Sequence, residues 1–320
     1  MKPNRRQTGR MILQERYRGS LLGLAVGDAL GTTLEFKRPG SFTPITEITG
    51  GGPFGLPPGY WTDDTSMALC LAESLLACQG FDPADQMNRY VDWWQNGHLS
   101  STGRCFDIGG TVSRSLARYL EDGDPYSGSS SPRTAGNGSL MRLAPIPLFF
   151  LQDPHLALQR AADSSRTTHA APTCLDACRY YAGLILGALQ GLPKSDLLTP
   201  YFSPIADGWA SQPLTDEIAE IAAGSFRQRH PPEIQGSGYV VRSLEAALWA
   251  FYHSESFAEG ALLAVNLGDD ADTTGAIYGQ LAGAYYGKRG IPESWLETLA
   301  LRETLEDYAT QLYKAALNQT

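Results

Sequence analysis

Apolar residues recur at spacings of three and four along much of the chain, and this period is typical of amphipathic helices. In the stretch 111–123 the apolar positions share one face: Val112, Leu116, Tyr119 and Leu120. Four further segments show helical patterning: 65–80, 174–191, 239–254 and 273–290. The alternation that strands require is scarce. The pattern therefore predicts an all-α fold with many helices around one core.

The last of these predicted helices carries a glycine at every fourth position: Gly275, Gly279, Gly283 and Gly287. One face of that helix is therefore nearly bare backbone, which favours close packing against another helix. Long segments rich in Gly, Pro and Ser at 38–61 and 121–139 predict loops, and long loops are often functional. We expect one domain over residues 15–320, preceded by a flexible arm over residues 1–14.

The composition of the chain excludes several classes of partner and site. The chain has 320 residues, 42% of them hydrophobic, and a net charge of −9. Because an acidic protein repels phosphate backbones and anionic membranes, we expect neither a nucleic acid nor a membrane as partner. The five cysteines are odd in number and lack CxxC pairs, which argues against a disulfide framework and a zinc site. We expect reduced thiols in a cytoplasmic protein, and a monomer as the default for one domain.

The first acidic cluster is "WTDDTS" at 61–66, directly before a predicted helix. Thr62 can cap that helix, and Asp63 and Asp64 in its first turn would favour the positive end of the helix dipole. Considered by itself, this cluster is better explained by capping than by a functional site.

The second cluster is "NLGDDADTTGA" at 266–276. Asp272 or Thr273 could cap the helix that follows, but a cap needs only one acceptor. Five aspartates over two helix starts exceed that need, and like charges so close together raise one another's pKa. If the two helix starts meet in space, a divalent cation would relieve the repulsion. Oxygen ligands favour Mg²⁺, Mn²⁺ or Ca²⁺ over zinc, and a site of this kind can hold two ions about 3.5–4 Å apart.

Two further acids lie in "GDALGTTLEF". Glu35 is surrounded by apolar residues and glycines, and it could join the two clusters, although a surface position is the simpler alternative. Asp28 carries less weight, because it could equally be an ordinary helix or turn residue.

Small residues elsewhere suggest a site for an anion. Gly109 and Gly110, in "CFDIGGTV", precede a helix, where free backbone N–H groups can bind a phosphate, although an ordinary turn is as good an explanation. "AGNGSLMR" also lets a backbone approach a phosphate, and its alternative is a tight turn. Single residues such as His169 and Tyr239 are by themselves equally compatible with a structural role.

Together these motifs resemble the ADP-ribosylglycohydrolase family, which includes the bacterial dinitrogenase-reductase-activating glycohydrolase. Seven stretches match in order between about Tyr17 and Gly287: "GSLLGLAVGDALGTTLEF", "WTDDTSMAL", "CFDIGGTV", "GNGSLMRLAP", "TTHAAP", "GYVVRSLEAALWAF" and "GDDADTTGAIYGQLAGAYYG". The resemblance implies an all-α fold of that family's type, with two Mg²⁺ ions (or Mn²⁺) in an ADP-ribose cleft.

The resemblance also implies roles for individual residues. The implied metal ligands are Thr62, Asp63, Asp64, Asp270, Asp272 and Thr273. The role of Asp269 stays open, and either Asp63 or Glu35 would transfer the proton. The implied substrate contacts are Asp107, Gly109, Gly110, Asn137, Gly138, Ser139, His169 and Tyr239.

The activity implied is hydrolysis of the bond between ADP-ribose and a protein side chain, with free ADP-ribose as product. Asp107 favours arginine as that side chain, because a carboxylate recognises a guanidinium well. Serine or another O-linked group is the alternative substrate. A non-catalytic ADP-ribose-binding or structural relative is a rival of another class, and the complete carboxylate set argues against it. A metal-dependent phosphoesterase usually relies on histidine ligands, and neither acidic cluster contains one.

Overall fold

The computed structural model describes residues 5–318, and within them the chain is all-α without a β-strand, as the periodicity predicts. The α-helices are α1 (Arg5–Gly31), α2 (Asp63–Cys78), α3 (Pro83–Asn96), α4 (Gly110–Asp122), α5 (Pro145–Phe149), α6 (Pro154–Arg166), α7 (Pro172–Leu189), α8 (Lys194–Leu197), α9 (Asp216–Ala223), α10 (Val240–Tyr252), α11 (Phe257–Val265), α12 (Ala271–Tyr286), α13 (Glu293–Thr298) and α14 (Arg302–Leu317).

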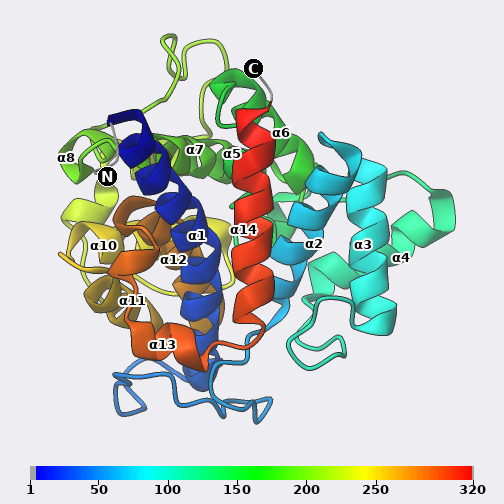
Figure 1. Ribbon diagram of the computed structural model, residues 1–320. Helices are drawn as coiled ribbons and strands as arrows, with labels where there is room; N and C mark the ends of the chain where they lie inside the picture. Colours follow the sequence, from blue (N-terminus) through cyan, green and yellow to red (C-terminus); the bar gives the residue numbers. More distant parts are fainter. Residues whose placement is uncertain (1–4, 319–320) are drawn as a thin grey trace.

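Helix α12 lies at the centre of the molecule and is buried along nearly its whole length. Helix α1 packs along one side of it, while α7, α10 and α11 pack around the others (Figure 1). Helix α14 lies beside α1 and also contacts α2. The buried apolar side chains of these helices form one continuous core, which places the beginnings of α2 and α12 in the molecular interior.

A seam of glycines joins α1 to α12. We call it the glycine seam: Gly19, Gly23 and Gly27 of α1 against Gly275, Gly279 and Gly283 of α12. A Cβ atom added at any of these positions would overlap a backbone carbonyl of the opposite helix. The close packing predicted for the glycine-spaced helix is therefore confirmed, and its partner is α1.

Two regions differ from the sequence prediction. The helix predicted at 273–290 is not the last, because α13 and α14 follow it. Residues 5–14, which we expected in a flexible arm, are the first turns of α1, and the remainder of that arm, residues 1–4, lies outside the described residues. The segment 15–31 was not recognised as part of a helix because its glycines, which the seam requires, weaken the apolar period.

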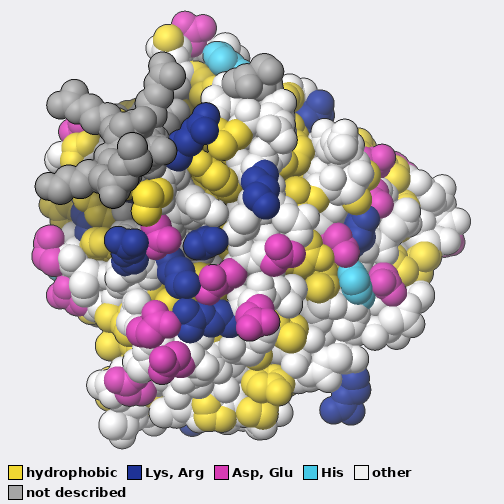
Figure 2. All heavy atoms as spheres, viewed as in Figure 1, with side chains coloured by type: hydrophobic (Ala, Val, Ile, Leu, Met, Phe, Trp, Pro, Cys, Tyr) yellow, Lys and Arg dark blue, Asp and Glu magenta, His cyan; other side chains and the backbone are white. Residues whose placement is uncertain are grey.

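The face of the molecule in Figure 2 carries Lys and Arg side chains interspersed with Asp and Glu, rather than a broad surface of one sign. This mixture offers no extended basic surface on that face for a phosphate backbone. Among residues 5–318, no helix has both the length and the apolar character that crossing a membrane requires.

Candidate metal centre and ligand cleft

The two acidic segments meet in space. The hydroxyl oxygen of Thr62, before α2, lies 3.2 Å from Asp64 Oδ2 and 3.3 Å from Asp272 Oδ2 at the start of α12. The hydroxyl of Thr273 lies 3.5 Å from the same Asp64 oxygen. Both helix starts are buried. The sequence expectation that these distant segments come together is thus realised at the N-termini of α2 and α12.

The start of α2 is capped from another helix. The backbone N–H groups of Thr62 and Thr65 donate to the two carboxylate oxygens of Asp28, over 2.9 and 3.1 Å. The Thr65 hydroxyl donates to the second of these oxygens over 2.6 Å. Thr62 occupies the N-cap position but makes no capping bond through its side chain. The cap expected from Thr62 is therefore wrong, and Asp28 supplies the acceptor instead, while Asp63 and Asp64 lie in the first turn of α2 as expected.

The start of α12 is capped in the same way by Glu35. Its Oε2 atom accepts hydrogen bonds from the backbone N–H groups of Ala271, at 3.1 Å, and Asp272, at 3.5 Å. Asp270 holds the N-cap position without a capping bond from its side chain. Its Oδ2 accepts instead from the amide of Asn137 over 2.6 Å. At both helix starts, acids delivered by the end of α1 do the capping.

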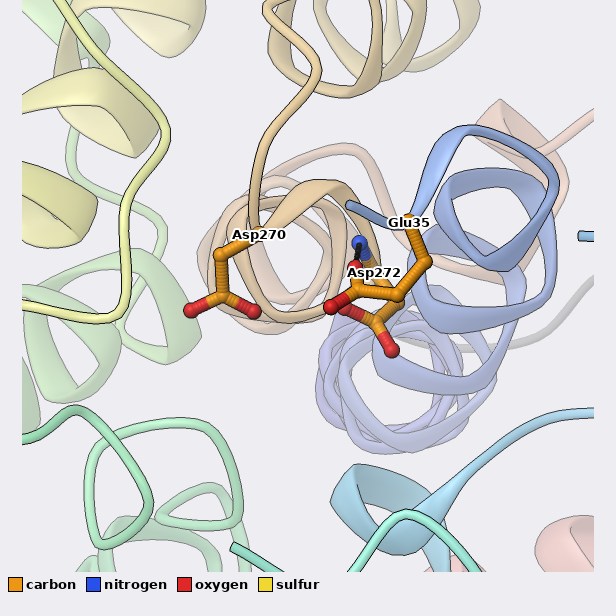
Figure 3. A group of neighbouring side chains, drawn as sticks. All are labelled: Glu35, Asp270 and Asp272. Atoms are coloured by element: carbon orange, nitrogen blue, oxygen red, sulfur yellow. Dashed lines mark hydrogen bonds between the residues drawn. The ribbon is translucent and has the colours of Figure 1, made fainter. Parts of the chain in front are cut away.

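The resulting cluster could hold a metal ion. Ligand oxygens of Glu35, Asp270 and Asp272 lie within 4.8 Å of one another. In Figure 3, Glu35 reaches from the segment after α1 to the start of α12, where its carboxylate lies against Asp272. One oxygen of Asp64 is buried without a hydrogen-bond partner. A cation would satisfy that oxygen, and a donor set made only of oxygens suits hard divalent ions.

Within residues 5–318, no positive side chain forms an ion pair with these acids. None of the ion pairs found between residues 5 and 318 includes an acid of the cluster. Burial, with the neighbouring carboxylates, raises the pKa of Asp28 and of Asp270 to about 7. The same causes raise the pKa of Glu35, Asp63 and Asp64 above their usual range. Without a cation the folded protein therefore favours protonated carboxyl groups here.

A cleft of about 330 Å³ opens over the cluster, and its lining residues form two groups that differ in chemistry. We call one group the acidic half, which comprises Glu35, Asp63, Asp107, Asp270 and Asp272. The other is the neutral half, which comprises Gly109, Gly110, Asn137, Gly138 and His169. Thr273 and Asp269 also line the cleft, while Lys and Arg are absent from its lining among the described residues. Most of the residues implied as ligands or substrate contacts thus surround one cavity.

Asp107 belongs to the acidic half and lies three residues before the start of α4. Its backbone has a φ of 60°, a left-handed conformation that is uncommon for a residue other than glycine. Burial, followed by the charge of Asp272, raises the pKa of Asp107 to about 9. A cationic group entering the cleft would favour the ionised form of this carboxylate.

Asp269 is exposed and also has a left-handed φ, of 59°. Its N–H donates to the carbonyl of Lys37, and its carbonyl accepts from the N–H of Phe36, both over 2.7 Å. This backbone pair ties the segment after α1 to the start of α12. These two hydrogen bonds fix the position of the backbone next to Glu35, whose side chain extends into the cluster.

Two residues implied as substrate contacts are not among those lining the cleft. Ser139 is buried, and its hydroxyl accepts from the hydroxyl of Ser165 over 2.7 Å. Tyr239 precedes α10, and its hydroxyl donates to Glu217 over 2.5 Å. Because both side chains have structural partners, the structure brings neither into the group of residues around the cavity.

His169 is buried between the neutral half and a pair of side chains that the sequence did not single out. Its Nδ1 atom lies 2.8 Å from the hydroxyl oxygen of Thr168, which accepts a hydrogen bond from Arg142 over 2.8 Å. Arg142 is 1% exposed, donates also to the carbonyl of Gly138, and stacks on the ring of Tyr90. An arginine within "NGSLMRLAP", an otherwise apolar segment, is the signal that could have identified it.

Comparison with known proteins places these features in context. The model of a family described as ADP-ribosylglycohydrolase matches residues 10–320. The chain is 39% identical over 302 residues to the ADP-ribosylarginine hydrolase Tri1 of Serratia proteamaculans (strain 568), covering 94% of this chain and 80% of the relative. It is 42% identical over 302 residues to the protein of the same name from Pseudomonas putida (strain GB-1), covering 94% and 79%.

The chain is also similar to a further bacterial protein and to a solved structure. The ADP-ribosyl-[dinitrogen reductase] glycohydrolase of Rhodospirillum rubrum is 34% identical over 299 residues, covering 91% of this chain and 92% of that protein. A solved structure titled "ADP-ribosylglycohydrolase-related protein complex" superimposes with a TM-score of 0.84 at 46% identity, covering 96% of this chain and 99% of that one.

Proposed function

The chain belongs to the ADP-ribosylglycohydrolase family, and from this premise we propose that it hydrolyses the glycosidic bond between ADP-ribose and a modified arginine side chain. The observation that carries the proposal is the buried, unbalanced carboxylate cluster at the base of a cleft. A non-catalytic relative would have no need to keep so many uncompensated acids together, because each one costs stability when it is ionised and buried.

We propose two Mg²⁺ ions as the resident metals, with Mn²⁺ as the alternative. The residues that would hold them are Thr62, Asp63, Asp64, Asp270, Asp272 and Thr273, with Glu35 beside them. Bound there, the ions would orient the ribose hydroxyls and make a water molecule more acidic. The support is the unpartnered Asp64 oxygen and the convergence of the two threonine hydroxyls on Asp64 and Asp272.

Proton transfer is better suited to Asp63 than to Glu35. One carboxylate oxygen of Glu35 already accepts hydrogen bonds from two backbone N–H groups at the start of α12. Asp63 lines the cleft, and burial raises its pKa, as a proton-transfer group at neutral pH requires. Glu35 then positions the start of α12, and it remains the alternative proton carrier.

The two halves of the cleft suit the two ends of the substrate. The neutral half offers the N-terminus of α4 and small residues to the diphosphate, without a cation that would compete for the acids. Asp107, in the acidic half, would accept hydrogen bonds from the guanidinium of the leaving arginine. Product release then gives free ADP-ribose and unmodified arginine. The cytoplasm as location and a monomer as the working form complete the proposal.

The decisive experiment compares linkages. The purified protein is incubated with an arginine-ADP-ribosylated protein and a serine-ADP-ribosylated peptide, each with Mg²⁺ or with EDTA, and released ADP-ribose is measured. We expect release from the arginine substrate only with Mg²⁺. Release from serine alone would overturn the arginine assignment. Release from neither substrate, with metal present, would overturn the enzymatic proposal.

A further inference from the structure

A buried arginine without an acidic partner stands behind the neutral half of the cleft. Arg142 makes no ion pair with any residue between 5 and 318, although it is almost fully buried. Its guanidinium donates to the carbonyl of Gly138 over 2.7 Å and to the hydroxyl of Thr168 over 2.8 Å. Because a buried charge without a counterion is costly, this placement calls for a role.

The hydrogen bonds fix the direction of each proton. An arginine side chain has donors only, so the Thr168 oxygen must accept from Arg142. The hydroxyl hydrogen of Thr168 is then available to His169 Nδ1, 2.8 Å away. If Nδ1 instead carried a hydrogen, the Thr168 oxygen would face two donors, and its own hydrogen would be buried without an acceptor. Nδ1 is therefore the acceptor of the pair.

The imidazole of His169 is also neutral. Burial, followed by the charge of Arg142, lowers the pKa of His169 to about 3. A neutral imidazole whose Nδ1 accepts must carry its hydrogen on Nε2. That nitrogen faces the neutral half: a Cβ added to Gly138 would lie 3.2 Å from it, and one added to Gly136 would lie 3.4 Å away. His169 itself lines the cleft.

We propose that Arg142 and Thr168 are positioning residues that hold His169 in the Nε2–H tautomer, so that the cleft presents an uncharged N–H donor to an oxygen of the bound ligand. The inference builds on the proposed function, in which that ligand is ADP-ribose. A neutral donor can bind a phosphate or hydroxyl oxygen without adding a cation next to the carboxylates. Arg142 thus acts on the ligand through its neighbours and does not touch it.

The tautomer can be read without any ligand. The full chain is labelled with ¹⁵N-histidine, the His169 signals are assigned by difference from His169→Gln, and the two ring nitrogens are distinguished by their ¹⁵N shifts and their couplings to ring protons. We expect a protonated Nε2 and an unprotonated Nδ1 at neutral pH. Protonation at Nδ1 would overturn the proposal, whatever the enzyme's activity proves to be.

Variants of Thr168 then link the tautomer to binding. Thr168→Val removes the donor to Nδ1, so we expect a mixed or reversed tautomer and an affinity for ADP-ribose about tenfold weaker by calorimetry. Thr168→Ser keeps the hydroxyl and should restore both signals. Thr167→Val is the matched control, because Thr167 is equally buried and its hydroxyl bonds Gln86, Ser164 and, over 3.5 Å, Arg142, but not His169. It should leave the His169 spectrum and the affinity unchanged.

The outcomes separate the two proposals. If Thr168→Val keeps both the wild-type tautomer and the wild-type affinity, the hydrogen bonds from Arg142 through Thr168 to His169 have no role, and the inference fails. Equal effects of the Thr167 and Thr168 variants on affinity would likewise overturn it, because the loss would then be general destabilisation. If the wild-type chain binds no ADP-ribose at all, the proposed function fails, while the spectrum of the free protein still tests the tautomer.

Discussion

The two halves of the cleft handle charge in opposite ways. The acidic half gathers carboxylates from the segment after α1, from the starts of α2 and α12 and from the segment before α4, and no basic side chain of the described chain neutralises them. The neutral half uses glycines, an amide and an uncharged imidazole. The comparison indicates that any cation that balances the acidic half would come from solution or from the substrate. A basic side chain in the neutral half would compete with them for the carboxylates.

The largest effect is expected from removing one charge in the acidic half. Asp63→Asn and Asp272→Asn should each lower kcat for the arginine substrate by about 10³-fold, because proton transfer or metal binding is lost. Circular dichroism should show an unchanged helix content. The matched control is Asp269→Asn, which makes the same change in an exposed residue of the same segment and should retain most activity. Equal losses in all three variants would contradict the division of roles.

The raised pKa values of the clustered acids also predict how the stability of the folded protein depends on pH. Because the pKa values of Asp28 and Asp270 rise from 3.8 to about 7 on folding, the folded state holds more protons than the unfolded state between these values. Stability of the metal-free protein should therefore fall as pH rises from about 4 to 7, with Asp107 extending the trend toward 9.

Metal should reverse that trend. A metal that binds only the folded state adds about 2.7 kcal/mol to the free energy of unfolding when its concentration is one hundred times Kd. This gain requires a pH at which the acids can ionise. Thermal unfolding is measured from pH 5 to 8 with EDTA and with Mg²⁺. The difference in Tm should widen as pH rises. A metal-free Tm that increases over this range would show that the cluster is balanced by some other charge.

Within the acidic half, Asp107 should respond to the identity of the leaving group. Asp107→Ala should reduce kcat/KM for the arginine substrate by about 30-fold, because the guanidinium loses its carboxylate partner. The affinity for free ADP-ribose, which has no guanidinium, should change little. Asp107→Asn separates charge from size and should resemble the alanine variant. Similar losses for arginine substrate and ADP-ribose would assign Asp107 to the metal cluster instead.

The smallest effect is expected in the neutral half. A Cβ added at Gly109 meets nothing within 4 Å, so Gly109→Ala should fold normally. The methyl group would lie at the start of α4, where the ligand approaches, and should weaken ADP-ribose binding by about fivefold. Calorimetry gives the affinity, and an unchanged Tm serves as the internal control. Unaltered affinity would place the phosphates elsewhere.

Sequence patterns predicted the parts of this molecule that depend on local chemistry. The helical period predicts α2, α4, α7, α10 and α12 to within a few residues. The like charges of Asp63 and Asp270 indicate a cation site from the sequence alone. The family assignment from ordered motifs is also confirmed. These signals lie within short segments, where spacing alone carries the information.

The capping by Asp28 and Glu35, and the hydrogen bonds from Arg142 through Thr168 to His169, depend on contacts between residues that are distant in sequence. From the sequence, Asp28 could equally be an ordinary helix or turn residue, because the partners that reveal its role, Thr62 and Thr65, lie 34 and 37 positions away. Arg142 and Thr168 are separated by 26 residues, and neither belongs to a charged cluster. One signal was nevertheless available. Gly19, Gly23, Gly27 and Gly31 repeat the four-residue spacing of the α12 glycines, and two such stripes in one chain predict that their helices pair.

The glycine seam has a consequence for how the protein is made. Helix α1 ends at residue 31 and α12 begins at residue 271, so the first helix to leave the ribosome waits for one of the last. Until then Glu35 has no helix start to cap, whereas the start of α2 is already available to Asp28. The part of the site at the start of α12 can be completed only after this long loop has closed. A messenger truncated before the codons for α12 would yield α1 without its partner in the seam, and an acidic cluster that lacks Asp272 and the helix start that Glu35 caps.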